Sequence, residues 1–139
     1  MDKNSNLDFL KRKLEKDPYS TLLGIKLEKV EKGYARVSLV LKENFRNFLG
    51  YIHGGLIFSL ADQAFAVASN SGGITSLALQ MNINYTRPPS VGDTLIAEAK
   101  EESITTRIGL YQIKVENSSH QLIARAQGIV YRKQSWKSN

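Results

Sequence analysis

Apolar and polar residues recur with two different periods along this chain. Three leucines between residues 6 and 16 are spaced by three and four positions, which predicts a short amphipathic helix that ends before Pro18. Two strand-like runs follow from Leu23, and the second has apolar residues at every other position. Residues 31–33 are expected to form the turn between them. The pattern therefore predicts a helix followed by a pair of strands.

A long apolar helix is predicted over about residues 55–70. Nearly every position in it is apolar or small, and the run Ser71-Gly72-Gly73 ends it. Four more strands follow, and residues 77–85 show the clearest alternation. Short links favour antiparallel pairing, and the lack of a strand-helix alternation argues against a doubly wound sheet. The sequence therefore predicts an α+β fold with one antiparallel sheet.

The long helix needs cover on nearly all sides. A helix that lies on one face of a sheet needs only a stripe of apolar residues, whereas this one is apolar almost all round. A strongly twisted sheet that wraps around it would bury it, particularly if a second copy of the chain covers the remaining flank. Its polar or small residues recur every three or four positions and form one narrow stripe, where a cleft could open. They are Ser59, Asp62, Gln63, Ala66 and Asn70.

Length and composition narrow the class of protein. The 139 residues fit a single domain over residues 1–139, with a polar tail from about residue 133. There is no cysteine, and the two histidines lie far apart in the sequence, so we expect no disulfide, no metal and no cofactor. No apolar run approaches the roughly 20 residues that span a bilayer, and residues 1–6 are polar. We therefore expect a cytoplasmic protein.

The net charge of +6 is consistent with nucleic acid, an anionic membrane surface or a polyanionic small ligand as partner. Much of the excess lies in the N-terminal helix and after the last strand, where solvated chain ends are the simplest interpretation. No nucleic-acid motif accompanies these residues. We therefore expect neither nucleic acid nor membrane as partner.

The most informative residue is Asp62, because it lies within the apolar helix. A carboxylate there must face a polar cleft, find a partner or shift its pKa. The helix begins after His53 with Gly54 and Gly55, which leave its free N–H groups unobstructed, and such groups can polarise a carbonyl oxygen. An amide donor and one carboxylate fit acyl hydrolysis. An anion-binding turn and a buried aspartate can also be purely structural.

The strongest resemblance to a known family lies in residues 47–70, NFLGYIHGGLIFSLADQAFAVASN. This segment closely resembles the active-site loop and central helix of PaaI-type hotdog-fold acyl-CoA thioesterases. The segment Asn82–Pro88 is also similar to that family, and the resemblance extends over about residues 22–132. It implies a hotdog fold, a homodimer whose two subunits join their sheets edge to edge, shared active sites between subunits, and a tetramer built as a dimer of dimers.

The resemblance also implies roles for individual residues. Asp62 would be the general base or the nucleophile, and the Gly54 N–H, with Asn47 nearby, would polarise the thioester carbonyl of an acyl-CoA substrate. His53 would orient the loop or contact the thioester, and the glycine and aspartate of one site would come from opposite subunits. The expected substrate-binding residues, which include an apolar acyl pocket and arginines for the phosphates of coenzyme A, are Gly55, Phe58, Gln63, Phe65, Leu79, Met81, Arg87 and Arg107.

Two points stay open at this stage. Some relatives place a serine or threonine near the clearest strand to orient water or substrate, and here Ser59, Ser69 or Ser76 could take that place. Direct nucleophilic attack and base-assisted attack by water are therefore both possible. The alternative function is a non-catalytic acyl-CoA-binding module of the same fold. Hydratase chemistry needs a different motif, which His53 before two glycines matches poorly.

Overall fold

The computed structural model describes residues 3–135. Three α-helices, one short 3-10 helix and six strands make up this part of the chain. In chain order they are α1 (Lys3–Glu15), α2 (Pro18–Leu23), β1 (Lys26–Glu31), β2 (Tyr34–Val40), η1 (Glu43–Phe45), α3 (Gly54–Asn70), β3 (Ile74–Tyr85), β4 (Thr94–Ile104), β5 (Ile108–Asn117) and β6 (Leu122–Ser135).

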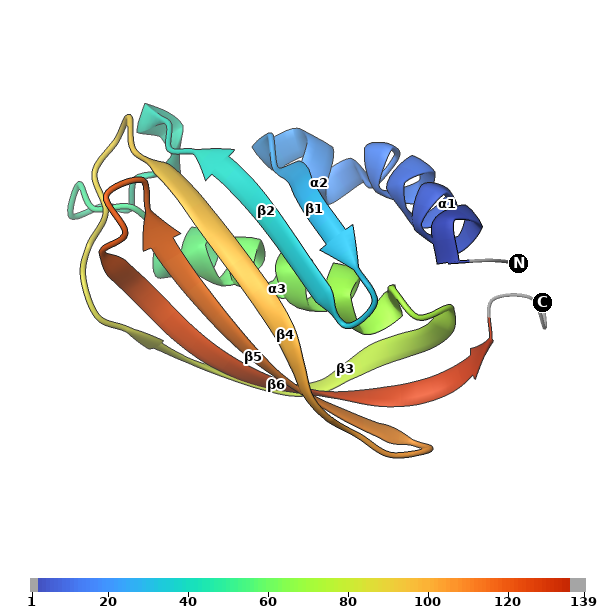
Figure 1. Cartoon of the computed structure of the whole chain (residues 1–139). Coiled ribbons are helices and arrows are strands. Elements are labelled where there is room, and N and C mark those ends of the chain that lie inside the picture. Colours follow the sequence, from blue (N-terminus) through green and yellow to red (C-terminus); the bar gives the residue numbers. More distant parts are fainter. Residues whose placement is uncertain (1–2, 136–139) are drawn as a thin grey trace.

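The six strands form one antiparallel sheet in the order β1-β2-β4-β5-β6-β3. The sheet curves around α3, and α1 and α2 lie beside α3 next to the edge strand β1 (Figure 1). This is the hotdog arrangement of the α+β class, so the fold expected from the sequence is confirmed. The other edge strand is β3, which directly follows α3.

The core lies between α3 and the concave face of the sheet. Small residues on β6 let the helix approach closely, and the tightest contact is between Phe65 of α3 and Gly128 of β6. A Cβ atom built on Gly128 would lie 2.5 Å from the Phe65 ring. Phe65 also packs against the Tyr111 ring of β5, with centroids 5.7 Å apart. The absence of a side chain at residue 128 therefore fixes how deep α3 sits in the sheet.

The N-terminal region differs from the prediction in one respect. The amphipathic helix expected over residues 6–16 is present as α1, but α2 was not predicted. Its N-cap is Asp17, whose side chain accepts a hydrogen bond from the Ser20 N–H, Pro18 occupies the first turn, and Gly24 ends it with a positive φ of 87°. These are ordinary start and stop signals, but they enclose only one and a half turns of helix.

The last strand extends into the predicted C-terminal tail. Strand β6 continues to Ser135, so residues 133–135, which were expected to belong to the tail, are part of the sheet. The remainder of the expected tail, residues 136–139, lies outside the described residues. Within residues 3–135 no helix is long and apolar enough to span a membrane.

The edge strand β3 carries large apolar side chains that solvent reaches. Leu77, Leu79 and Tyr85 are 53%, 61% and 48% exposed. The register with β6 shifts between Ala78 and Gln80, which leaves Leu79 as the extra residue of a bulge. An uncovered strand edge with apolar side chains is a ready surface for pairing with another chain.

Candidate active site

The start of α3 presents an amide without an acceptor. Gly54 is the first helical residue and His53 is the N-cap, whose side chain makes no capping hydrogen bond. The His53 carbonyl accepts hydrogen bonds from the amides of Leu56 and Ile57, at 3.1 and 3.3 Å. The Gly54 N–H itself has no hydrogen-bond acceptor among residues 3–135. The Gly54 N–H and the His53 carbonyl belong to the same peptide group. Because that carbonyl already accepts hydrogen bonds from the helix, the peptide is polarised and its N–H is a stronger donor.

The loop before α3 is held in shape by Asn47. Its side-chain oxygen accepts hydrogen bonds from the amides of Leu49 and Tyr51, at 2.9 and 3.1 Å. The guanidinium of Arg46 adds a bond to the Gly50 carbonyl at 2.7 Å and an ion pair with Glu43. The Asn47 oxygen is therefore committed to the loop, and its amide nitrogen has no partner in the described part of the chain.

Asp62 lies in the middle of α3 and is half-buried. Its carboxylate has no hydrogen-bond donor and no ion-pair partner among residues 3–135. Burial alone raises the pKa of this carboxyl above its ordinary value. An uncompensated carboxylate in an apolar helix is unfavourable for the fold, and such groups are concentrated at functional sites.

The N-terminal helices contact the polar stripe of α3 on either side of Asp62. The Tyr19 hydroxyl is 2.8 Å from the Ser59 hydroxyl, which in turn donates to the Gly55 carbonyl. The Gln63 amide lies 3.4 Å from the Asp17 carboxylate. A cavity of about 470 Å³ opens between α1 and α3. It is lined by Leu10, Leu14, Asp17, Gln63, Ala66, Val67 and Asn70, among others.

Gly54 and Asp62 do not face the same point within one chain. They are eight residues apart on one straight helix, so about 12 Å of helix axis separates them. A thioester carbonyl that accepts a hydrogen bond at 3 Å from the amide is therefore out of reach of the carboxylate of the same chain. Any reaction that uses both groups needs a second copy.

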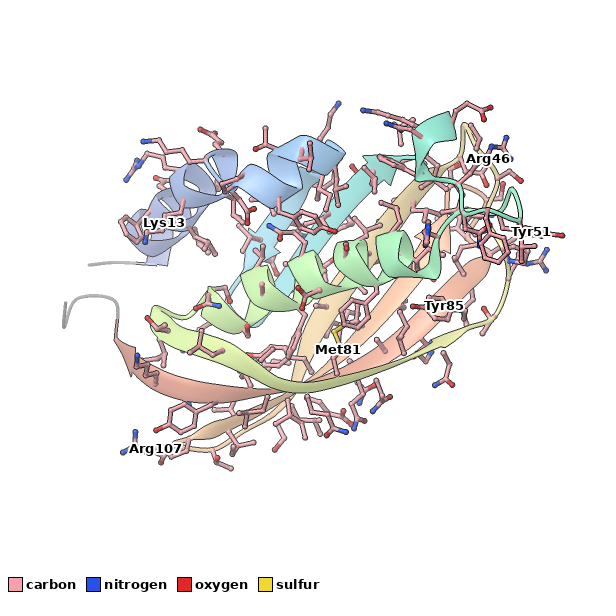
Figure 2. The ribbon with its side chains drawn as sticks, turned by 180° about the vertical axis from the view of Figure 1, so that it is seen from behind. Lys13, Arg46, Tyr51, Met81, Tyr85 and Arg107 are labelled. Carbon is pink, nitrogen blue, oxygen red and sulfur yellow. The ribbon has the colours of Figure 1, made fainter. Side chains whose placement is uncertain are left out.

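The expected substrate-binding residues fall into three groups. Phe58 and Gln63 are half-buried on α3, Gly55 has open space around it, and Met81 lies below the middle of α3 (Figure 2). Phe65 is buried in the core against β6, and its role in substrate binding stays a prediction. Leu79 and Arg87 are exposed on and just after β3.

Arg107 is separated from the rest of the candidate site. It lies at the tip of the β4–β5 hairpin, at the opposite end of the sheet from Tyr51 and Tyr85 (Figure 2). The chain therefore does not bring Arg107 and the start of α3 together within one copy. Its contact with the phosphates of a substrate stays a prediction.

Three serine hydroxyls could have replaced the missing hydroxyl of the family pattern. Ser59, Ser69 and Ser76 each donate to a backbone carbonyl, those of Gly55, Ala66 and Ile74. All three are therefore engaged within the chain, and the choice between the two mechanisms stays open.

Sequence reasoning missed two tyrosines that contact the site. Tyr19 reaches Ser59 from α2, and the Tyr85 hydroxyl donates to the Gly54 carbonyl at 2.9 Å from the end of β3. Tyr85 lies in the segment Asn82–Pro88 that resembles the family. Its contact with Gly54, however, depends on the strand register, which a local sequence pattern does not show. In the described part of the chain no three His, Cys, Asp or Glu side chains gather in a group that could hold a metal ion.

The six-stranded antiparallel sheet wrapped around α3 is the hotdog fold of thioesterases. The chain belongs to the Thioesterase superfamily, whose model matches residues 49–124. It is thus an enzyme of the thioester hydrolase class.

Individual relatives agree with this assignment. The chain is 35% identical over 118 residues to the acyl-coenzyme A thioesterase PaaI of Escherichia coli, an alignment that covers 85% of this chain and 84% of the relative. The solved structure of that E. coli protein, from the phenylacetic acid degradation operon, superposes with a TM-score of 0.91 at 31% identity and covers 95% and 96% of the two chains.

Two further solved structures are similar. A single-residue variant of the phenylacetic acid degradation protein PaaI from Thermus thermophilus gives a TM-score of 0.81 at 33% identity, over 84% of this chain and 100% of the other. A Streptococcus mutans protein bound to acetyl CoA gives 0.77 at 28% identity, over 80% and 90%.

Proposed function

We propose that this enzyme hydrolyses acyl-CoA thioesters to the free acid and coenzyme A in active sites shared between two copies of the chain. Asp62 of one copy acts as general base or nucleophile, and the Gly54 N–H of the other polarises the thioester carbonyl. The observation that carries the proposal is the Asp62 carboxylate, half-buried in an apolar helix without any partner among residues 3–135.

The raised pKa of Asp62 suits a base. A carboxylate whose pKa lies closer to neutrality takes a proton from water more readily, and a poorly hydrated carboxylate is also a better nucleophile. Ser59 is a poorer candidate for the nucleophile, because its hydroxyl is engaged by Gly55 and Tyr19, and the chain contains no cysteine.

The Gly54 amide supplies the second part of the mechanism. As the thioester carbonyl becomes tetrahedral, negative charge develops on its oxygen, and an unpaired N–H at a helix start stabilises that charge. Removing one such donor typically costs about 3 kcal/mol of barrier. Because Gly54 and Asp62 are about 12 Å apart in one chain, the two groups come from different copies.

The exposed edge of β3 supports the pairing of two copies. Joining two β3 edges would extend the sheet across both copies and cover Leu77 and Leu79, which solvent reaches in the single chain. We propose this homodimer as the functional unit and a dimer of dimers as its larger assembly. The tight loop around Asn47 would then lie near the carboxylate of the partner.

Coenzyme A as the leaving group is consistent with the charge of the protein. The net charge of +6 favours a substrate that carries several phosphates, and exposed Arg87 follows the edge strand β3. The E. coli relative is named an acyl-coenzyme A thioesterase, and the S. mutans relative binds acetyl CoA. The acyl group is expected to be aromatic or of medium chain length.

The test is release of free thiol from phenylacetyl-, benzoyl- and hexanoyl-CoA, followed with a thiol reagent. The wild-type protein should turn over at least one of the three. Asp62→Asn should lower kcat by about 10² to 10⁴-fold, the usual contribution of a general base, while the protein still binds the thioester. Asp8→Asn, at an exposed position of α1, is the matched control and should keep the wild-type rate.

Two results would contradict the proposal. Binding of all three thioesters without thiol release would identify a non-catalytic acyl-CoA-binding module instead. Turnover by Asp62→Asn at the wild-type rate would show hydrolysis by a different group.

A further inference from the structure

Tyr85, the last residue of β3, makes two contacts with Gly54, the first residue of α3. Its hydroxyl donates a hydrogen bond to the Gly54 carbonyl at 2.9 Å. Its ring lies against the Cα side of the same residue, because a Cβ atom built on Gly54 would be 3.3 Å from the ring carbon that bears the hydroxyl. Figure 2 shows Tyr85 below the start of α3.

The close approach of the ring explains why residue 54 is a glycine. Gly54 is not among the glycines with positive φ, so its backbone conformation is open to any residue. The neighbouring Gly55 offers a comparison, because a Cβ atom there would meet nothing within 4 Å. At Gly54 a Cβ atom would lie 3.3 Å from the Tyr85 ring, so the ring or the peptide would have to move by a few tenths of an ångström. The missing side chain therefore serves the tyrosine contact, not backbone freedom.

Tyr85 is itself firmly anchored. It pairs with Ala124 of β6, and the next residue, Thr86, makes two hydrogen bonds to β6, from its N–H to the Ile123 carbonyl at 2.9 Å and from its hydroxyl to the Leu122 carbonyl at 2.8 Å. The ring thus projects from a fixed point of the sheet. It connects the strand edge that we assign to the subunit interface with the first residue of the catalytic helix.

We propose that Tyr85 is a positioning residue that holds the Gly54 peptide in place, so that its free N–H points where the oxyanion forms. This inference rests on the proposed function. The helix amides hold the His53 carbonyl on one side of Gly54, and Tyr85 holds the Gly54 carbonyl on the other. With both flanking carbonyls fixed, the N–H between them cannot reorient freely, and a preorganised donor stabilises a transition state better than a mobile one.

The first test is Tyr85→Phe, which removes the hydroxyl and keeps the ring. Loss of one neutral hydrogen bond that acts mainly in the transition state should lower kcat about five- to tenfold. KM should stay within about twofold, and the loss of one exposed hydrogen bond should lower the melting temperature by no more than about 2–4 °C. Tyr131→Phe is the matched control, because Tyr131 is partly exposed on β6 and its hydroxyl has no partner in the described chain. It should keep the wild-type kcat.

The second test combines Tyr85 with Gly54. In the wild-type background, the methyl group of Gly54→Ala meets the Tyr85 ring and should displace the peptide. In a Tyr85→Ala background that methyl group has room. The kcat losses should therefore be non-additive, with Gly54→Ala costing at least about threefold less in the Tyr85→Ala protein. Additive losses would show that the two residues act independently.

A measurement without substrate separates this inference from the proposed function. The Gly55 N–H shares its peptide with the Gly54 carbonyl, so loss of the Tyr85 hydrogen bond should move the Gly55 amide proton upfield in an NMR spectrum of Tyr85→Phe. No shift would overturn the contact whether or not the wild type hydrolyses thioesters. A shift with unchanged kcat would overturn the positioning role alone, and a wild type that releases no thiol would overturn the proposed function.

Discussion

At the scale of single residues, Asp62 is a carboxylate in an environment that is unfavourable for its charge. Its side chain is half-buried, has no partner among residues 3–135 and projects from an otherwise apolar helix. Asn47 and Tyr85 have the opposite character, since their polar atoms make defined hydrogen bonds to the backbone of the loop and of Gly54. The hydrogen bonds of Asn47 and Tyr85 stabilise the local structure, while the unpaired carboxylate of Asp62 is unfavourable for folding.

The pKa of Asp62 predicts how stability depends on pH. Below the ordinary pKa of aspartate the carboxyl is protonated in both states and costs nothing. As pH rises through the raised pKa of the folded state, folding must keep a poorly hydrated carboxylate, so stability falls. Asp62→Asn should therefore raise the free energy of unfolding at pH 7, and the gain should vanish towards pH 3.

Urea titrations of wild type and Asp62→Asn at several pH values measure this difference. Asp8→Asn controls for the change in net charge, because Asp8 is exposed on α1. A variant less stable than wild type at pH 7 would show that the carboxylate has a stabilising partner in the assembled protein.

The oxygen and the nitrogen of the Asn47 side-chain amide are expected to have separate effects, the oxygen on stability and the nitrogen on kcat. Asn47→Asp keeps the oxygen that accepts from Leu49 and Tyr51, so stability should stay close to that of wild type. It removes the amide nitrogen, and if that nitrogen contacts the thioester oxygen, kcat should fall about 100-fold. Asn47→Ala should lose both the rate and about 1 kcal/mol of stability. Full activity of Asn47→Asp would restrict Asn47 to the loop.

At the scale of elements, the fit of α3 into the sheet depends on one glycine. Gly128→Ala would place a methyl group 2.5 Å from the Phe65 ring, so the ring or the helix must move. We expect a loss of about 1–3 kcal/mol in the free energy of unfolding, measured by urea or thermal denaturation.

Gly72→Ala is the matched control for this change. A Cβ atom there would make only an ordinary contact with Lys32 at 3.7 Å, and its φ is not positive. Its stability should stay within about 0.5 kcal/mol of wild type. Equal effects of the two substitutions would mean that the helix does not sit as close to β6 as the structure shows.

The sequence predicted the elements with strong periodicity. The long helix was found because nearly every residue from about 55 to 70 is apolar or small, and the clearest strand because apolar residues alternate over residues 77–85. The short helix α2 was missed because six residues give too little periodicity, although Asp17, Pro18 and Gly24 mark its ends. The Tyr85–Gly54 contact joins residues 31 positions apart and depends on the pairing of β3 with β6, so no local pattern could reveal it.

At the scale of the whole molecule, the distance between Gly54 and Asp62 is the main argument for active sites shared between two copies. One chain carries each group once, at points about 12 Å apart along α3. Two copies related by a two-fold axis would bring the amide of each next to the carboxylate of the other, and so form two sites. The N-terminal helices cover another flank of α3, as Tyr19 and Gln63 show. In the proposed dimer, each chain contributes the amide of one site and the carboxylate of the other.

Complementation between two inactive variants tests this arrangement most directly. Asp62→Asn lacks the carboxylate. Gly54→Pro lacks the N–H; proline is acceptable in the first turn of a helix, and its Cβ atom requires the Tyr85 ring to shift by a few tenths of an ångström. Each variant alone should be nearly inactive. Refolded together in equal amounts they should recover about a quarter of wild-type activity, because half of the dimers are mixed and each mixed dimer has one intact site.

The control pairs Asp62→Asn with a chain that carries both substitutions, which offers no intact carboxylate and should recover nothing. Recovery of about a quarter in the first mixture alone is the result that shared sites require. Mixed dimers that form but stay as inactive as either parent would contradict a site in which the amide and the carboxylate come from different copies.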